Sequence, residues 1–185
     1  GLGDVYKRQS CTSNCNSFSI NSGSVHAWDE GVAFYTGSLE GTDGSGSGKM
    51  VYALADKRCQ NYKTCGAKAD SATGTSQVNI ELFKLFDQGK ATLSASKCAD
   101  VRPIVDKIIT LMTVPLIQGT LRYAYKGEYL SPSGFSQKEK AEGAVFAASV
   151  LPRVASCSAS AAATISTEMR LDSSTTIKPD FEAVK

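Results

Sequence analysis

Apolar side chains recur at steps of three and four residues along most of this chain, and no other feature constrains its fold as strongly. Such spacing places apolar residues on one face of an α-helix. The pattern predicts helices that begin near residues 24, 51, 78, 99, 136 and 154. Alternating runs typical of strands are short, and no Asn-Gly or Asp-Gly turn joins two of them. We therefore expect an all-α fold, arranged as a helical bundle.

Local signals predict several helix ends. Ser136 and Glu139 have the spacing of a capping box, so a helix should start there. A preceding helix is expected to stop at Gly89. Pro115 lies inside the longest predicted helix and should kink or divide it, and Pro152 should bend or restart the helix that follows. The prediction is thus a bundle with a kinked long central helix.

Six cysteines are spread over a chain rich in Ser, Thr, Gly and Ala, which is typical of a secreted, oxidised protein. They are Cys11, Cys15, Cys59, Cys65, Cys98 and Cys157. A zinc site is disfavoured because zinc clusters use Cys-x-x-Cys pairs, and this chain has one histidine. Proximity favours Cys59 with Cys65 and Cys11 with Cys15, which leaves Cys98 with Cys157. Other connectivities stay open at this point.

Composition suggests one helical domain over residues 25–170, since 185 residues with 42% hydrophobic content can bury a single good core. Residues 1–24 are predicted to form an extended polar arm. Within it, residues 1–9 (GLGDVYKRQ) resemble a translated adaptor and are set aside as a scar. Residues 171–185 are expected to be a polar tail, or a linker to a further repeat.

Several function classes are disfavoured by the sequence. The net charge is +2 and no basic run occurs, so nucleic acid is not an expected partner. Asp106 and Lys107 interrupt the most apolar stretch, and no membrane span is expected. Nucleophilic catalysis needs a base beside a nucleophile, yet the only histidine is His26 and no serine lies in a Gly-x-Ser-x-Gly elbow. We predict that the chain is not an enzyme.

Metal binding is the chemical option that remains. His26 and Glu30 are four residues apart, so they share a helix face and could chelate one ion. Glu142 occupies the same place in a second Glu-Gly-x-x-Phe pattern, and carboxylates from separate helices are how bundles hold iron. The alternative is that Glu30 and Glu142 pair with Arg58 and Arg122 to fix helix register. We favour the ion pairs, and keep His26, Glu30 and Glu142 as candidate iron ligands.

Four segments of the chain resemble a known family. They are WDEGVAFYTGSLEG at 28–41, YALADKRC at 52–59, VPLIQGTLRYAY at 114–125 and KAEGAVFA at 140–147. Their order and spacing resemble the algal low-iron-inducible periplasmic protein family, with the likeness extending over residues 25–169. The resemblance implies a secreted domain that takes part in iron assimilation on the outer face of the plasma membrane, without catalysis. Our first hypothesis is that such a domain binds iron weakly for delivery to a cell-surface iron transporter.

A second interpretation is a structural subunit of an extracellular filament or surface layer. Copies of the chain would join head to tail through residues 1–24, because contacts of that kind propagate into open polymers. The abundance of Ser and Thr would suit O-glycans, and no asparagine stands in an N-glycosylation sequon. The resemblance supplies no established iron ligands, so it does not decide between these two functions.

Overall fold

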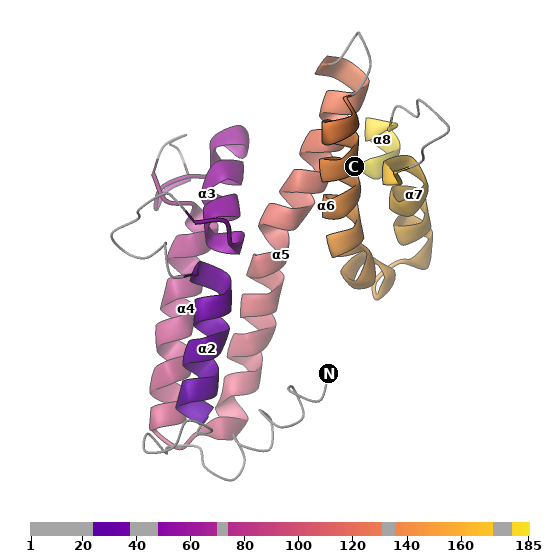
Figure 1. The fold of residues 1–185 in the computed structure, drawn as a ribbon. Coiled ribbons are helices and arrows are strands. Elements are labelled where there is room, and N and C mark those ends of the chain that lie inside the picture. The colour runs from indigo at the N-terminus through magenta and orange to yellow at the C-terminus, as the bar shows by residue number, and fades with distance from the viewer. Residues whose placement is uncertain (1–23, 38–47, 70–73, 131–135, 172–178) are drawn as a thin grey trace. The chain divides into compact units, whose positions relative to one another are not determined.

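The computed structural model describes residues 24–37, 48–69, 74–130, 136–171 and 179–185 (Figure 1). These residues form helices and no named strand, so the all-α prediction is confirmed. The chain divides into two compact units, residues 1–112 and 113–185, where the sequence suggested one domain. Residues 1–23 of the predicted arm, and with them the predicted Cys11–Cys15 pair, lie outside the described residues.

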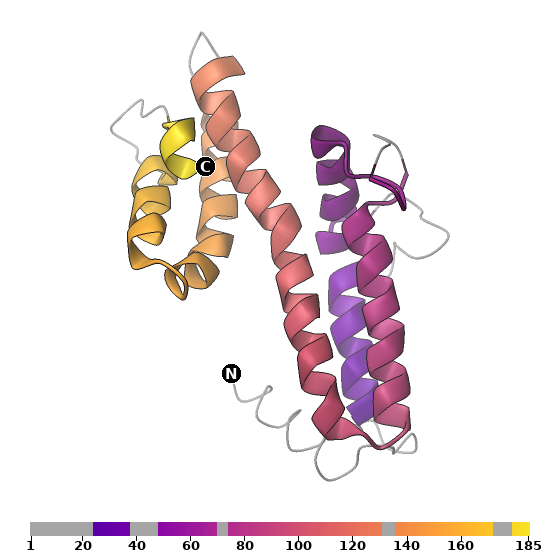
Figure 2. The same cartoon turned by 180° about the vertical axis from the view of Figure 1, so that it is seen from behind.

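The described residues of unit 1 form three helices, one 3-10 turn and the first half of a fourth helix. The elements are α2 (Ser24–Thr36), α3 (Val51–Tyr62), α4 (Gln77–Ser94), η1 (Cys98–Val101) and α5 (Arg102–Tyr125). Helix α2 lies along α4 in both views of the ribbon (Figures 1 and 2). The C-terminal end of α2 is a glycine with positive φ, Gly37, whose N–H donates to the carbonyl of Ala33 at 2.7 Å.

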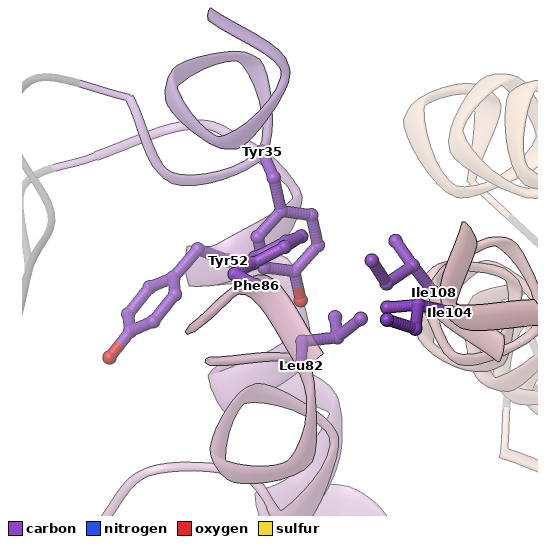
Figure 3. Close-up of a cluster of buried hydrophobic side chains, with 6 residues drawn as sticks. All are labelled: Tyr35, Tyr52, Leu82, Phe86, Ile104 and Ile108. Carbon is purple, nitrogen blue, oxygen red and sulfur yellow. The ribbon is translucent and has the colours of Figure 1, made fainter. Parts of the chain in front are cut away.

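The core of unit 1 is aromatic at its centre and aliphatic towards α5 (Figure 3). The rings of Tyr35 and Phe86 meet edge to face, with centroids 5.8 Å apart, a favoured geometry for aromatic pairs. Leu82 points from α4 towards the isoleucines of α5 (Figure 3). The buried members are Tyr35, Tyr52, Leu82, Phe86, Ile104 and Ile108. Helices α2, α3, α4 and α5 therefore all contribute to one shared core.

Helix α4 passes through Gly89 and ends at Ser94, so the predicted stop at Gly89 is wrong. Gly89 is buried, and a Cβ built on it would lie 2.0 Å from Cζ2 of Trp28. Glycine is present here because the indole needs the space, not because the helix ends. The true end lies beyond Leu93, where Ser96 adopts positive φ.

In unit 2, the part that the structure describes contains the second half of α5, followed by three further α-helices. After α5 come the π-helical turn η2 (Lys126–Leu130), α6 (Gln137–Ala155), α7 (Ala159–Met169) and α8 (Phe181–Val184). The predicted capping box is confirmed: the Ser136 side chain accepts from the Glu139 N–H, and the Glu139 carboxylate accepts from the Ser136 N–H. The core of this unit holds Ala124, Ala147, Met169 and Val184.

Neither internal proline divides its helix. Pro115 is fully buried inside α5, and α6 continues through Pro152 to Ala155. A proline removes one backbone donor and crowds the preceding turn, but packing on the rest of a long helix can offset that loss. The long central helix is therefore continuous, and its Pro115 lies close to the point where unit 1 gives way to unit 2.

Pro179 and Val184 are buried and α8 packs against α7, so residues 179–185 belong to unit 2 and are not a free tail.

The helical stretch Cys98–Tyr129 is long and apolar enough to cross a membrane, judged by length and composition alone. Asp106 and Lys107, which interrupt its apolar sequence, lie exposed on the helix, and the expectation that it spans no membrane stays a prediction.

Candidate functional site

The disulfide between Cys59 and Cys65 is confirmed, with Cα atoms 5.0 Å apart. It closes the turn that follows α3, where Lys63 takes a left-handed conformation. Cys65 also forms an isolated antiparallel bridge with Ser76, the N-cap of α4. The disulfide thus fixes the end of one helix to the start of the next, as a staple in a small secreted domain should.

The predicted pair between Cys98 and Cys157 is wrong. Cys157 is an exposed free thiol, whereas Cys98 is disulfide-bonded. Cys98 belongs to η1 in unit 1 and Cys157 follows α6 in unit 2. The pairing had been reached by elimination, and elimination fails when one cysteine stays reduced.

A buried polar network holds α2, α3 and α4 of unit 1 together. The Tyr35 hydroxyl donates to Oδ1 of Asn79 at 2.5 Å. The Asn79 amide in turn donates to the Tyr52 carbonyl at 3.0 Å and to Oδ1 of Asp56 at 2.8 Å. Burial is the main cause that raises the pKa of Tyr35 well above its usual value, with Asp56 adding to it. The Tyr35 hydroxyl therefore keeps its proton, and because these groups are hydrogen-bonded to one another, the role of the network is structural.

The two unit 1 candidates lie on α2 as predicted. His26 is half-buried and Glu30 is exposed, one helical turn apart. Arg58, the expected partner of Glu30, is buried on α3 with 3% of its surface exposed.

Glu142 lies on α6 in unit 2, and its contacts differ from the ion pair that the sequence predicted. Its Oε2 accepts a hydrogen bond from the Tyr123 hydroxyl of α5, and its Oε1 lies 3.9 Å from Nζ of Lys138. Among the described residues Glu142 therefore pairs with Tyr123 and Lys138, and the predicted pair with Arg122 is not formed. The carboxylate remains accessible, since 40% of its side chain is exposed.

The two Glu-Gly-x-x-Phe patterns take different roles in the structure. Phe34 is 70% exposed, and a Cβ on Gly31 would meet nothing within 4 Å. In unit 2, Gly143 is buried between Tyr123 and Met169, at 3.0 Å and 3.1 Å from a built Cβ. The repeat in sequence is therefore not a repeat in packing.

Within the part of the chain that the structure describes, no three His, Cys, Asp or Glu side chains gather in a group that could hold a metal ion. His26 and Glu30 belong to unit 1 and Glu142 to unit 2. What the structure adds is Tyr123, whose phenol oxygen touches Glu142. The sequence did not point to Tyr123, because a tyrosine in an apolar helix is expected to be a core residue.

These features define a class: a disulfide-stapled, all-α domain with two helical units and a free thiol. The sequence profile of the low iron-inducible periplasmic proteins matches residues 4–176, and this chain belongs to that family. The match includes residues 4–9, which the adaptor interpretation had set aside. The family description agrees with a location outside the plasma membrane. Neither the curated proteins nor the solved structures contain a significant match.

Proposed function

We propose that this chain is a non-enzymatic domain that binds iron weakly outside the plasma membrane, for delivery to a transporter at the cell surface. Family membership over residues 4–176 carries the proposal. A protein that is induced when iron is scarce, and is held in the periplasm, is placed to meet iron before uptake. Weak binding suits that task because the metal must be released again.

Tyr123 and Glu142 are the iron contact that we propose in unit 2. Phenolate and carboxylate oxygens are both ligands that proteins use for iron. The Tyr123 phenol oxygen and a carboxylate oxygen of Glu142 are hydrogen-bonded to each other, and the exposed part of Glu142 gives a metal ion access to them. Iron would replace the phenolic proton of Tyr123, so the affinity should rise with pH. The ammonium of Lys138 opposes a cation here, which keeps the site weak.

His26 and Glu30 are the second candidate pair, in unit 1. An imidazole and a carboxylate at i and i+4 can take one ion on a helix face, and like Tyr123 and Glu142 they supply two ligands. Such a pair leaves the remaining coordination positions to water or to a chelator that arrives with the metal. The two candidate pairs can be distinguished because only the first contains a phenolate.

The test is titration of the full chain with ferric citrate, followed by calorimetry and by visible absorbance. A phenolate bound to ferric iron absorbs visible light, whereas carboxylate and imidazole ligands alone give no such band. We expect a band in the wild type that the Tyr123→Phe/Glu142→Gln variant lacks. The His26→Gln/Glu30→Gln variant should keep the absorbance band. Its binding heat should fall only if unit 1 also binds iron. The control is Tyr62→Phe with Glu81→Gln, which removes a phenol and a carboxylate elsewhere.

An absence of binding heat in the wild type would refute iron binding by this chain. Binding with an unchanged band in Tyr123→Phe/Glu142→Gln would refute the proposed site alone. The alternative function, an extracellular filament joined through residues 1–24, depends on residues that the structure mostly does not describe. Sedimentation of the chain with and without residues 1–23 tests it, since a filament subunit should lose its concentration-dependent assembly when the arm is removed.

A further inference from the structure

An exposed aromatic cluster lies where η2 and α8 of unit 2 meet. Tyr125 and Tyr129 are 42% and 49% exposed, and their ring centroids are 5.1 Å apart. The ring of Phe181 meets both edge to face, at 5.4 Å and 6.1 Å. Tyrosines this exposed are normally scattered singly, and a contiguous group of aromatic rings on a surface indicates an interaction site. We call these three rings, with the charged residues beside them, the α8 patch.

Carboxylates surround the rings. Glu128 accepts a hydrogen bond from the Phe181 N–H at 2.6 Å, and Asp180 caps α8 by accepting from the Ala183 N–H at 3.0 Å. The Glu128 carboxylate is the main cause that raises the pKa of Tyr129, and Glu182 and Asp180 add to it through their charge. The rings therefore lie in a region of negative potential made by three acidic side chains.

This patch already holds one organic cation, which belongs to the chain itself. The Lys185 ammonium lies 5.8 Å from the centroid of the Phe181 ring and 2.8 Å from a carboxylate oxygen of Glu182. An ammonium group over a ring face, with a carboxylate beside it, is the arrangement by which proteins recognise cations. This contact indicates that the patch can bind an ammonium group.

We propose that the α8 patch is a docking surface for a lysine- or arginine-bearing segment of a protein partner, and that Lys185 occupies one of its cation positions until the partner displaces it. Charge complementarity favours this occupant, because among the described residues that contact the rings or each other here, Glu128, Asp180 and Glu182 outnumber Lys185. The patch is an open surface, so several cations spaced along an extended segment would reach more of its carboxylates than one small ammonium ion could.

The probe is an acetylated peptide in which arginine alternates with glycine, compared with the same peptide carrying citrulline. Binding to the full chain is followed by fluorescence anisotropy at two salt concentrations. We expect the arginine peptide to bind, the citrulline peptide to bind at least about tenfold more weakly, and added salt to weaken the arginine peptide. Tyr125→Ala and Tyr129→Ala should each weaken it about two- to fivefold, since each removes a ring while leaving the charge unchanged.

The chain offers a matched ion pair as a control. Glu81 and Lys84 on α4 are 2.7 Å apart at spacing i, i+3, and Glu182 and Lys185 are 2.8 Å apart at the same spacing. Lys185→Gln should tighten the peptide about threefold because it vacates a cation position, while Lys84→Gln should leave its affinity unchanged. Glu182→Gln should weaken binding and Glu81→Gln should not. Phe34→Ala removes an exposed ring outside the patch and serves as the aromatic control.

Several results would overturn the proposal. Equal effects of Lys84→Gln and Lys185→Gln would show that only net charge matters. Unchanged binding in the two tyrosine variants would show that the rings take no part. Competition by tetramethylammonium at concentrations similar to the peptide would assign the patch to a small cation instead. A circular dichroism spectrum for each variant confirms that a lost affinity is not lost folding.

Discussion

The indole of Trp28 lies against α4 at Gly89, so closely that no other residue could take the place of that glycine without movement. A Cβ at position 89 would be 2.0 Å from the indole Cζ2, and the indole Nε1 donates to the carbonyl of Phe86 at 3.0 Å. The hydrogen bond holds the ring in place, so the ring cannot turn away from an added methyl group at no cost. This contact therefore helps to position α2 on α4, together with the contacts that Tyr35 makes with Asn79 and Phe86.

The first prediction follows from this contact. Gly89→Ala should lower the free energy of unfolding by about 1–3 kcal/mol, because the overpacked methyl outweighs the better helix propensity of alanine. Gly31→Ala is the matched control: Gly31 lies in α2 with nothing within 4 Å of a built Cβ. That substitution should stabilise the chain by roughly 0.5–1 kcal/mol. Urea unfolding measures both, and a stabilised Gly89→Ala variant would contradict the packing.

A second prediction concerns the buried amide of Asn79, which has no exposed surface. Asn79→Ala removes the partner of the Tyr35 hydroxyl and of the Tyr52 carbonyl, and both groups stay buried. We expect a loss of roughly 3 kcal/mol in unfolding free energy. The exposed Asn61 of α3 is the control, and its change to alanine should alter stability by less than about 0.5 kcal/mol. Similar losses at the two positions would argue against the network.

The staple between Cys59 and Cys65 can be removed on its own. The Cys59→Ser/Cys65→Ser variant should lose about 2 kcal/mol, the value expected from the chain entropy of so short a loop. Thermal unfolding under non-reducing conditions measures the difference. Cys157→Ser, at an exposed free thiol, should leave the midpoint unchanged.

The free thiol itself gives a further prediction. Iodoacetamide should label Cys157 in the native protein, because the side chain is exposed and unbonded, while Cys59, Cys65 and Cys98 stay unlabelled until a reductant is added. Peptide mapping by mass spectrometry locates the label. A native protein that resists labelling at Cys157 would mean that this cysteine is oxidised after all.

Lowering the pH should destabilise the N-terminal end of α6 over a defined pH range. The Lys126 ammonium, with help from the Ser136 hydroxyl, lowers the pKa of Glu139 from 4.5 to about 2. A lowered folded-state pKa stabilises the fold fully above the unfolded value, and this contribution is lost as the pH falls from 4.5 towards 2. The difference in stability between wild type and Glu139→Gln should therefore shrink across that window. Glu81→Gln, whose pair is exposed, is the control, and NMR titration of Glu139 measures the pKa directly.

Local signals predicted much of the fold because they depend on few residues. The capping box at Ser136 and Glu139 and the pair Cys59–Cys65 were each predicted from spacing, and both are confirmed. Gly89 shows why other signals fail. A glycine that ends a helix and a glycine that admits an indole look the same in one sequence, and only the position of Trp28 distinguishes them.

The contacts of Glu142 were harder to predict for a similar reason. Arg122 and Tyr123 are neighbours in sequence, but successive residues of a helix point about 100° apart, so only one of them can face a given carboxylate. Charge suggested Arg122, whereas the structure places the Tyr123 hydroxyl on Glu142. A prediction from charge alone therefore identified the helix and missed the side chain.

Helix α5 runs unbroken from Arg102 to Tyr125, and the two units divide between Met112 and Thr113. Ile104 and Ile108 complete the core of one unit, while Ala124 belongs to the core of the other. Cutting the chain between Met112 and Thr113 would remove from both halves the backbone hydrogen bonds of α5 that cross this point. A fragment meant to keep either core should therefore carry the whole of α5.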